Sequence, residues 1–181
     1  LDFYNARRRD YVGCEPNAAH YGLAELERQY DVTVVTQNVD DLHERAGSSK
    51  VIHLHGELMK NCSVRNTQKT YPVDPEHPDL HVGDLAPDGS QLRPFIVWFG
   101  EAVPMIEPAI REASQADIMV VVGTSLNVPA ASLLAYVPNG TPIYLIDPKE
   151  VNTHGIAHVT HIQKVATQGV QELLEILMPK S

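Results

Sequence analysis

The strongest constraint on the fold is a set of short apolar runs, rich in β-branched residues, that end abruptly in polar residues. Residues 32–36, 51–54, 117–125 and 142–147 have this character. Such runs are typical of buried strands, and segments with helical patterns lie between them. Because strands that alternate with helices favour a mostly parallel, doubly wound sheet, we predict an α/β, Rossmann-like fold.

The predicted core is interrupted once. We expect helices at residues 1–11, 18–26, 104–116, 130–136 and 169–178, a short helix or turn at 41–46, and a last strand at 161–165. Residues 60–91 differ, because they carry four prolines and few apolar side chains. A loop of this length inside a compact domain is usually functional or tied down. We therefore divide the chain into a core, residues 1–59 and 92–181, and an inserted loop module, residues 60–91.

Charge and cysteine content exclude several classes of protein. The formal net charge of the 181-residue chain is −9, which argues against non-specific binding to nucleic acid or anionic membranes. The only basic run is residues 7–9, and we expect at least two of its three arginines to lie on a solvated helix face. Two cysteines imply no disulfide framework and fit a reducing cytoplasm. No apolar stretch approaches a membrane span.

Two strand ends carry the best candidates for catalysis. Gln37 and Asn38 follow the first central strand, and His55 follows the second. Ligands of open α/β sheets bind beyond the carboxyl ends of the strands, and an imidazole suits proton transfer near neutral pH. His53 alternates with His55, so we expect both on one face of a strand, and the glycine that follows favours His55 as the active one. An isolated histidine would more often be a core residue bonded to a carbonyl.

Two later strand ends suggest a nucleotide. Gly123, Thr124 and Ser125 would let a backbone approach a ligand closely and would offer hydroxyl and N–H donors. Asp147 could accept two hydrogen bonds from a ribose diol. Each signal alone is also ordinary turn chemistry, but together they describe a crevice of nucleotide size.

Five motifs in series resemble those of the sirtuins, the NAD-dependent protein-lysine deacylases of the Sir2 type. They are Thr36-Gln37-Asn38-Val39-Asp40, Leu42-His43-Glu44-Arg45-Ala46-Gly47, His53-Leu54-His55-Gly56-Glu57, Val97-Trp98-Phe99-Gly100-Glu101 and Gly123-Thr124-Ser125-Leu126. Their order and spacing are compatible with the family over nearly the whole chain, the 60–91 segment excepted.

The resemblance implies a role for each motif in NAD chemistry. His55 would be the general base, accepting a proton from the nicotinamide-ribose hydroxyl after the acyl oxygen attacks the ribose. The residues expected to contact NAD are Gln37, Asn38, Asp40, Gly123, Thr124, Ser125, Asp147 and Ala166.

The same resemblance implies how an acyl-lysine peptide would bind. Val97 and the turn formed by Phe99, Gly100 and Glu101 would line the acyl-lysine channel, which we expect to be dry and walled also by Trp98. The peptide would pair as a strand between this turn and the segment that contains Asn127.

A Tyr-x-x-Arg pair suggests selectivity for acidic acyl groups. Tyr4 and Arg7 are three residues apart in a predicted helix and therefore neighbours on one face. A phenol beside a guanidinium can bind a carboxylate, and class III sirtuins use such a pair to read succinyl- or malonyl-lysine. We assign residues 1–12 to this helical acyl-recognition module. An ordinary amphipathic helix would also contain such pairs.

Three features depart from the family pattern. No Gly-rich strand–turn–helix precedes Leu1, and a protein that began there would bind NAD feebly. Cys62 is the only cysteine in the interval where sirtuins usually carry two Cys-x-x-Cys pairs, so we expect no zinc, because Cys62, His77 and His81 supply at most three of four ligands. The aromatic residue that the family often carries just before this proline is also absent before Pro129.

The sequence therefore predicts a cytoplasmic, NAD-dependent deacylase of protein lysines. It would remove succinyl, malonyl and also acetyl groups and release nicotinamide and O-acyl-ADP-ribose. Two alternatives stay open: a catalytically silent module that binds acyl peptides, which the missing N-terminal turn favours, and a mono-ADP-ribosyltransferase, against which the Tyr4/Arg7 pair argues.

Overall fold

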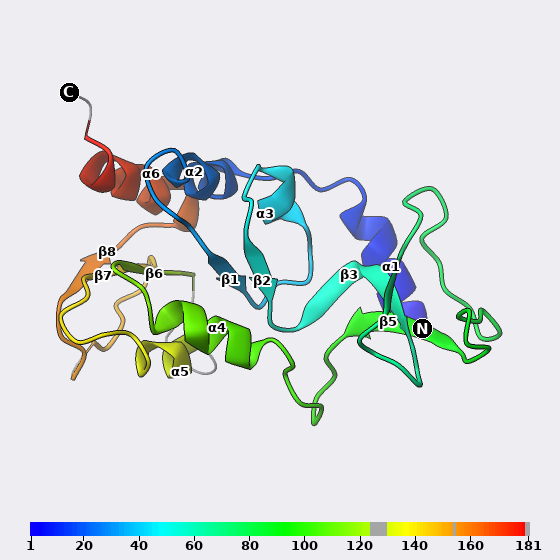
Figure 1. Cartoon of the computed structure of the whole chain (residues 1–181). Helices are drawn as coiled ribbons and strands as arrows, with labels where there is room; N and C mark the ends of the chain where they lie inside the picture. Colours follow the sequence, from blue (N-terminus) through cyan, green and yellow to red (C-terminus); the bar gives the residue numbers. More distant parts are fainter. Residues whose placement is uncertain (124–129, 154, 180–181) are drawn as a thin grey trace. The chain divides into compact units, whose positions relative to one another are not determined.

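The computed structural model describes residues 1–123, 130–153 and 155–179, and these residues form two compact units (Figure 1). We describe each unit by itself. The first unit comprises Leu1–Glu15, Val35–Leu42 and His53–Met105, and the second comprises Pro16–Val34, His43–Ile52 and Ile106–Ser181.

The second unit is built on a parallel sheet of three strands in the order β6-β7-β8. These strands are β6 (Met119–Val122), β7 (Ile143–Ile146) and β8 (Val159–Ile162). The last strand was predicted at residues 161–165, which is too far along the chain, because the stretch that pairs with β7 begins at Val159 and ends at Ile162.

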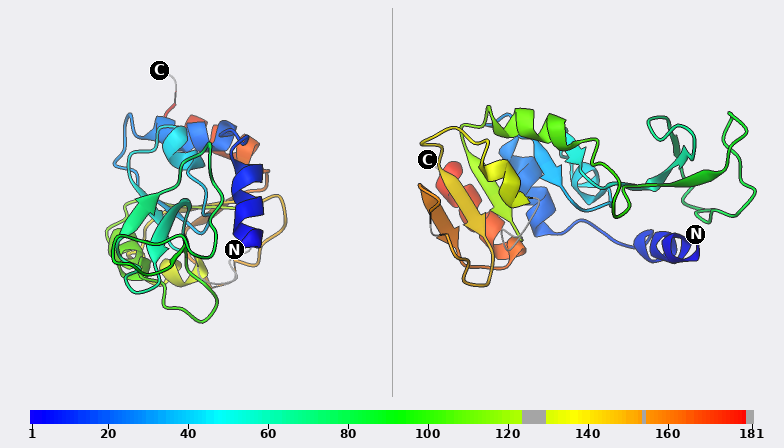
Figure 2. Two further views of the ribbon diagram at one scale, coloured as in Figure 1. Left: turned by 90° about the vertical axis from the view of Figure 1, so that its right-hand side faces the viewer. Right: turned by 90° about the horizontal axis from the view of Figure 1, so that it is seen from below.

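Helices cover both faces of this sheet, as a doubly wound fold requires (Figures 1 and 2). They are α2 (Ala18–Leu26) and α6 (Ala166–Leu177) on one face, and α4 (Ile106–Ala113) and α5 (Ala130–Leu134) on the other. Side chains of β7 alternate accordingly. Ile146 packs with Val170 and Leu173 of α6, whereas Leu145 belongs to a separate cluster with Leu134 of α5.

The N-terminus of α2 is closed by a capping box. The side chain of Asn17 accepts hydrogen bonds from the backbone N–H groups of Ala19 and His20, at 2.9 and 3.3 Å, and the His20 ring accepts one from the Asn17 N–H. Gly22 lets α2 approach α6 closely, since a Cβ there would lie 2.6 Å from Cγ1 of Val170. The predicted helix over 18–26 is confirmed.

The first unit contains an antiparallel sheet where a loop module was predicted. Its order is β4-β3-β5, formed by β4 (Thr70–Pro72), β3 (Gly56–Ser63) and β5 (Leu92–Ile96). The prediction of an extended loop from residue 60 was wrong for β3 and β4. Lys60 and Asn61 interrupt the apolar pattern of β3, although Leu58 and Cys62 are buried in it.

The remaining regular elements are short. They are the paired strands β1 (Val34–Thr36) and β2 (Val51–His53), and the single-turn helix α3 (Leu42–Arg45). Both strands are shorter than predicted, by two residues at the start of β1 and one at the end of β2.

Helix α1 (Asp2–Tyr11) is anchored in the first unit by two buried polar side chains. Asn5 exchanges two hydrogen bonds with the backbone of Leu80, both of 2.9 Å. Arg8 is fully buried and donates to four oxygens. These are the carbonyls of Leu58 (2.9 Å), Pro78 (3.1 Å) and Lys60 (3.2 Å), and Oδ1 of Asn61 (2.7 Å). Arg7 and Arg9 are exposed, which confirms the expectation for two of the three arginines.

The carboxylate of Asp88 is hydrogen-bonded within the same unit. Asp88 accepts hydrogen bonds from the hydroxyls of Ser63 and Ser90, both of 2.6 Å, and from the backbone of Ser90 at 2.9 Å. These bonds lower the pKa of Asp88 to about 2, with the Ser63 hydroxyl as the largest cause.

Among the residues that the structure describes, none of the helices is long and apolar enough to cross a membrane.

Candidate active site

His55 lies in the turn between β2 and β3, and two backbone contacts fix its position. Its ring Nδ1 is 3.2 Å from the carbonyl oxygen of Gln37, and its own carbonyl accepts a 2.9 Å hydrogen bond from the N–H of Val97. The expectation that His53 and His55 share one face of a continuous strand was wrong, because the strand ends at His53.

The contact with the Gln37 carbonyl determines which ring nitrogen of His55 carries the hydrogen and which can accept a proton. A carbonyl oxygen can only accept a hydrogen bond, so Nδ1 of His55 must carry the hydrogen. In the neutral imidazole, Nε2 then has a free lone pair. His55 is half-buried, and this nitrogen is able to accept a proton.

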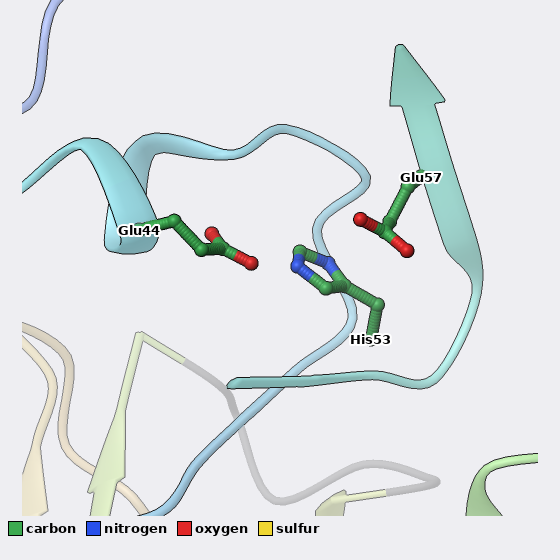
Figure 3. Close-up of side chains that lie close together, drawn as sticks. All are labelled: Glu44, His53 and Glu57. Carbon is green, nitrogen blue, oxygen red and sulfur yellow. The ribbon is translucent and has the colours of Figure 1, made fainter. Parts of the chain in front are cut away.

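His53 has a different environment. It is 7% exposed, and its Nδ1 lies 3.1 Å from the carbonyl oxygen of Asn38. Figure 3 shows its ring and the carboxylate of Glu57 turned toward each other, with ligand atoms within 4.8 Å. Glu57 also accepts a hydrogen bond of 2.8 Å from Lys60. The burial of His53 fits a structural role, in contrast to the partial exposure of His55.

Gly56 is required for the sharp turn that follows His55. Its φ angle is +87°, in the region that side chains with a Cβ rarely adopt. A Cβ at this position would also lie 2.1 Å from the carbonyl oxygen of Phe95, because β3 begins here against the end of β5. The glycine therefore sets the position of the histidine beside it.

The polar residues after β1 offer free side chains next to His55. Gln37 is half-buried and Asn38 is exposed, and in the described residues the side-chain amide of neither makes a hydrogen bond. Asp40 is partly engaged, since its carboxylate accepts a 3.1 Å hydrogen bond from the N–H of Leu42. The structure thus brings Gln37 and His55 together, and it leaves amide donors and acceptors available for a polar ligand.

The turn from Trp98 to Glu101 is held by Arg93 of β5. The guanidinium binds the Glu101 carboxylate through two nitrogens, at 2.7 and 3.1 Å, and lies 3.6 Å from the centre of the Trp98 ring. Phe99 at the tip of the turn is fully exposed. Trp98 is 42% exposed.

Tyr4 and Arg7 lie on α1 as predicted. Arg7 is exposed, and its guanidinium stands 5.2 Å from the centre of the Phe3 ring, which in turn packs edge-on against Tyr4. In the part of the chain that the structure describes, Arg7 forms no ion pair and no hydrogen bond. Its cation is therefore available to a ligand.

Three further predicted cofactor residues belong to the second unit. Gly123 directly follows β6 with a φ of +64°, and its N–H donates a 2.9 Å hydrogen bond to the carbonyl of Ile146. Asp147 is 8% exposed, and its carboxylate accepts a 2.8 Å hydrogen bond from the N–H of Lys149. Ala166 is the first residue of α6. The other predicted residues, Thr124, Ser125 and Asn127, lie outside the described residues.

Comparison with known proteins settles the family. The model of the Sir2 family matches residues 1–130. The chain belongs to the Sir2 family. Among curated relatives of this sirtuin, an NAD-dependent protein deacylase of Bacteroides thetaiotaomicron is 55% identical over 183 residues, covering 99% of this chain and 78% of the relative. Another, from Helicobacter pylori strain 26695, is 51% identical and covers 98% and 77%.

Solved structures agree with this assignment. A Sir2 homologue in complex with NAD has a TM-score of 0.83 and 38% identity, over 97% of this sirtuin and 70% of that chain. A Sir2 protein bound to an acetylated peptide has a TM-score of 0.75 and 34% identity, over 92% and 73%. The α/β fold predicted for the chain is thereby confirmed.

The sequence reading missed two residues that shape the site of this sirtuin. Arg93 ties the Trp98–Glu101 turn, and Arg8 anchors the helix that carries Tyr4 and Arg7. A sequence signal existed only for Arg93, because an arginine and a glutamate flank the apolar stretch 94–99. Arg8 stands between two exposed arginines and nothing in the sequence distinguishes it.

Proposed function

We propose that this sirtuin, an NAD-dependent protein deacylase, acts preferentially on lysines that carry acidic acyl groups, succinyl and malonyl, and also removes acetyl groups. The products would be nicotinamide and O-acyl-ADP-ribose. The observation that supports the deacylation chemistry is the geometry of His55, whose Nδ1 is occupied by the carbonyl of Gln37 while Nε2 is left as a proton acceptor.

His55 is the general base in this proposal. NAD held here would supply an electrophilic ribose carbon, and attack of the substrate's acyl oxygen on it would break the bond to nicotinamide, the leaving group. A base near neutral pKa then has to remove a proton from a ribose hydroxyl, and Nε2 of His55 has the free lone pair for it. The hydrogen bond to the Gln37 carbonyl selects this tautomer of the neutral ring and fixes the orientation of the ring.

The cofactor contacts follow from the groups that are free. The side-chain amides of Gln37 and Asn38, which make no hydrogen bond within the described part of the chain, offer both donors and acceptors, which suits ribose hydroxyls and an ordered water. Asp40 retains a carboxylate oxygen for the nicotinamide carboxamide. On the second unit, we propose that the contacts come from Gly123, Thr124, Ser125, Asp147 and Ala166.

Selectivity for acidic acyl groups is assigned to α1. Arg7 has no carboxylate partner within the described chain, and its guanidinium offers a fork of N–H donors that matches a carboxylate. Tyr4 adds a phenolic donor from the same helix. The acyl-lysine itself would bind along Val97 and the turn of Phe99, Gly100 and Glu101, with its peptide paired as a strand toward Asn127.

The test measures acyl removal from acetyl-, malonyl- and succinyl-lysine peptides with NAD, by mass spectrometry, on the full natural protein. His55→Ala should abolish all three reactions. Arg7→Met should lower kcat/KM for the succinyl peptide roughly 10- to 150-fold, as expected for the loss of a charged hydrogen bond worth ~1.5–3 kcal/mol, and leave deacetylation nearly unchanged.

Arg9→Met is the matched control, because Arg9 is an exposed arginine two residues away on the same helix, paired with Asp79. Equal losses for succinyl and acetyl peptides in Arg7→Met would contradict the assigned selectivity. Turnover that survives His55→Ala would remove the proposed base.

A further inference from the structure

Arg93 makes an unusual number of contacts with one short turn. Besides the two bonds to Glu101, its Nη2 donates a 2.8 Å hydrogen bond to the carbonyl of Ile96. Its guanidinium lies over the ring of Trp98 at 3.6 Å. The Arg93 side chain is only 12% exposed, whereas the Glu101 carboxylate that it binds is 39% exposed.

Glu101 completes a closed set of interactions within the turn. One of its carboxylate oxygens accepts the N–H of Trp98 at 2.8 Å, and its own N–H donates to the carbonyl of Trp98 at 3.0 Å. Gly100 has a φ of +86°, which allows the chain to reverse. The hydrogen bonds from Arg93 and Trp98 lower the pKa of the Glu101 carboxyl, so the carboxylate stays charged at neutral pH.

Apolar packing contributes little to this turn. Phe99 at its tip is fully exposed and Trp98 is 42% exposed. A segment with so little buried apolar surface has low local stability unless polar contacts restrain it. A bidentate arginine–carboxylate pair combined with stacking on an indole is a restraint of this kind, because it fixes both distance and orientation.

We propose that Arg93 is a positioning residue for the acyl-peptide substrate. It acts through Glu101 and Trp98, and it holds the backbone of Phe99 and Gly100 in the shape that accepts the substrate strand. The inference rests on the proposed function, in which this turn lines the acyl-lysine channel. Glu101 accordingly serves as the partner of Arg93, and its carboxylate does not have to touch the substrate.

Trp98 is the only tryptophan of the chain, so its fluorescence reports directly on this turn. The experiment measures acrylamide quenching of Trp98 without substrate, and KM and kcat for an acylated peptide with NAD. The variants are Arg93→Met, Arg93→Lys and Glu101→Gln, with Arg111→Met, an exposed arginine of α4, as the control.

We expect Arg93→Met and Glu101→Gln to increase quenching of Trp98 and to raise KM roughly 5- to 50-fold, while kcat changes less than about threefold. Arg93→Lys should bring both the quenching of Trp98 and KM part of the way back to the values of the unaltered protein, since lysine keeps the charge but not the two-nitrogen geometry of the guanidinium. The double variant Arg93→Met/Glu101→Gln should be no worse than either single variant, because both remove the same pair.

Unchanged quenching in Arg93→Met would overturn the proposal, as would increased quenching with an unchanged KM. If Arg93→Met fails to fold, Glu101→Gln decides alone, since Glu101 is exposed. If even the unaltered protein removes no acyl group, the proposed function fails, whereas the quenching of Trp98 still decides whether Arg93 orders the turn.

Discussion

The burial of Arg8 makes a strong prediction about stability. Arg8→Met keeps most of the volume and the apolar stem of the side chain but removes every donor. The carbonyls of Leu58, Lys60 and Pro78 and Oδ1 of Asn61 would each lose a partner. An unsatisfied buried acceptor costs about 1–3 kcal/mol, so four of them would cost roughly 4–12 kcal/mol without compensation.

Two effects reduce this sum. Burial of the guanidinium lowers the pKa of Arg8, and the charge of Asp79 offsets this lowering only in part. The folded state therefore carries a desolvation cost, which methionine would relieve. The freed acceptors can also relax toward water. We therefore expect a net loss of about 3–5 kcal/mol in the free energy of unfolding, a large part of the roughly 5–15 kcal/mol of a typical domain.

Urea unfolding measures this loss, and amide hydrogen exchange locates it. The unfolding midpoint should fall by about 1.5–2.5 M for an m-value near ~2 kcal/mol/M. Protection should decrease first along β3 and at Leu80, which Asn5 and Arg8 tie to α1. Arg9→Met is the control, because the exposed pair of Arg9 with Asp79 is worth about 0–1 kcal/mol. Equal midpoints for the two variants would refute the reasoning.

Three further predictions concern other contacts. The folded pKa of Asp88, about 2, lies below its ordinary value of 3.8. The contribution of Asp88 to stability should therefore be complete above about pH 4 and disappear as the pH falls to 2. Urea unfolding of Asp88→Asn between pH 2 and 7 should lack this part of the pH dependence. Gly56→Ala should destabilise the protein by more than about 2 kcal/mol, in thermal unfolding, because the new Cβ meets the carbonyl of Phe95. Asn17→Ala should cost about 1 kcal/mol through the lost cap of α2, whereas Asn17→Ser should cost less.

The second unit was predictable because its signals are local. Residues 142–147 form an apolar run that ends in a polar residue, and residues 18–26 have a helical pattern. The turn around His55 could also be anticipated, since a histidine and a glycine after an apolar run indicate a strand end with a catalytic candidate.

The first unit could not be read in the same way, because its order comes from contacts between distant residues. β3 is a strand through its pairing with β5, about 30 residues later in the chain, and its own sequence contains Lys60 and Asn61. Arg8 bonds to oxygens that lie 50–70 residues away, and the nature of its partners, three of them backbone carbonyls, leaves no trace in the sequence. Hydrogen bonds from side chain to backbone specify no residue type at the acceptor.

The three consecutive arginines of α1 place the requirement for folding and the requirement for substrate selectivity, which usually conflict, on different residues. Successive residues of a helix point in directions about 100° apart, so Arg8 faces the interior while Arg7 and Arg9 face outward. If Arg7 reads the acyl group, a change of substrate preference requires a substitution at a position that contributes little to folding. Such a helix can vary its selectivity freely over evolution or in the laboratory, provided that the arginine between the two variable positions is retained.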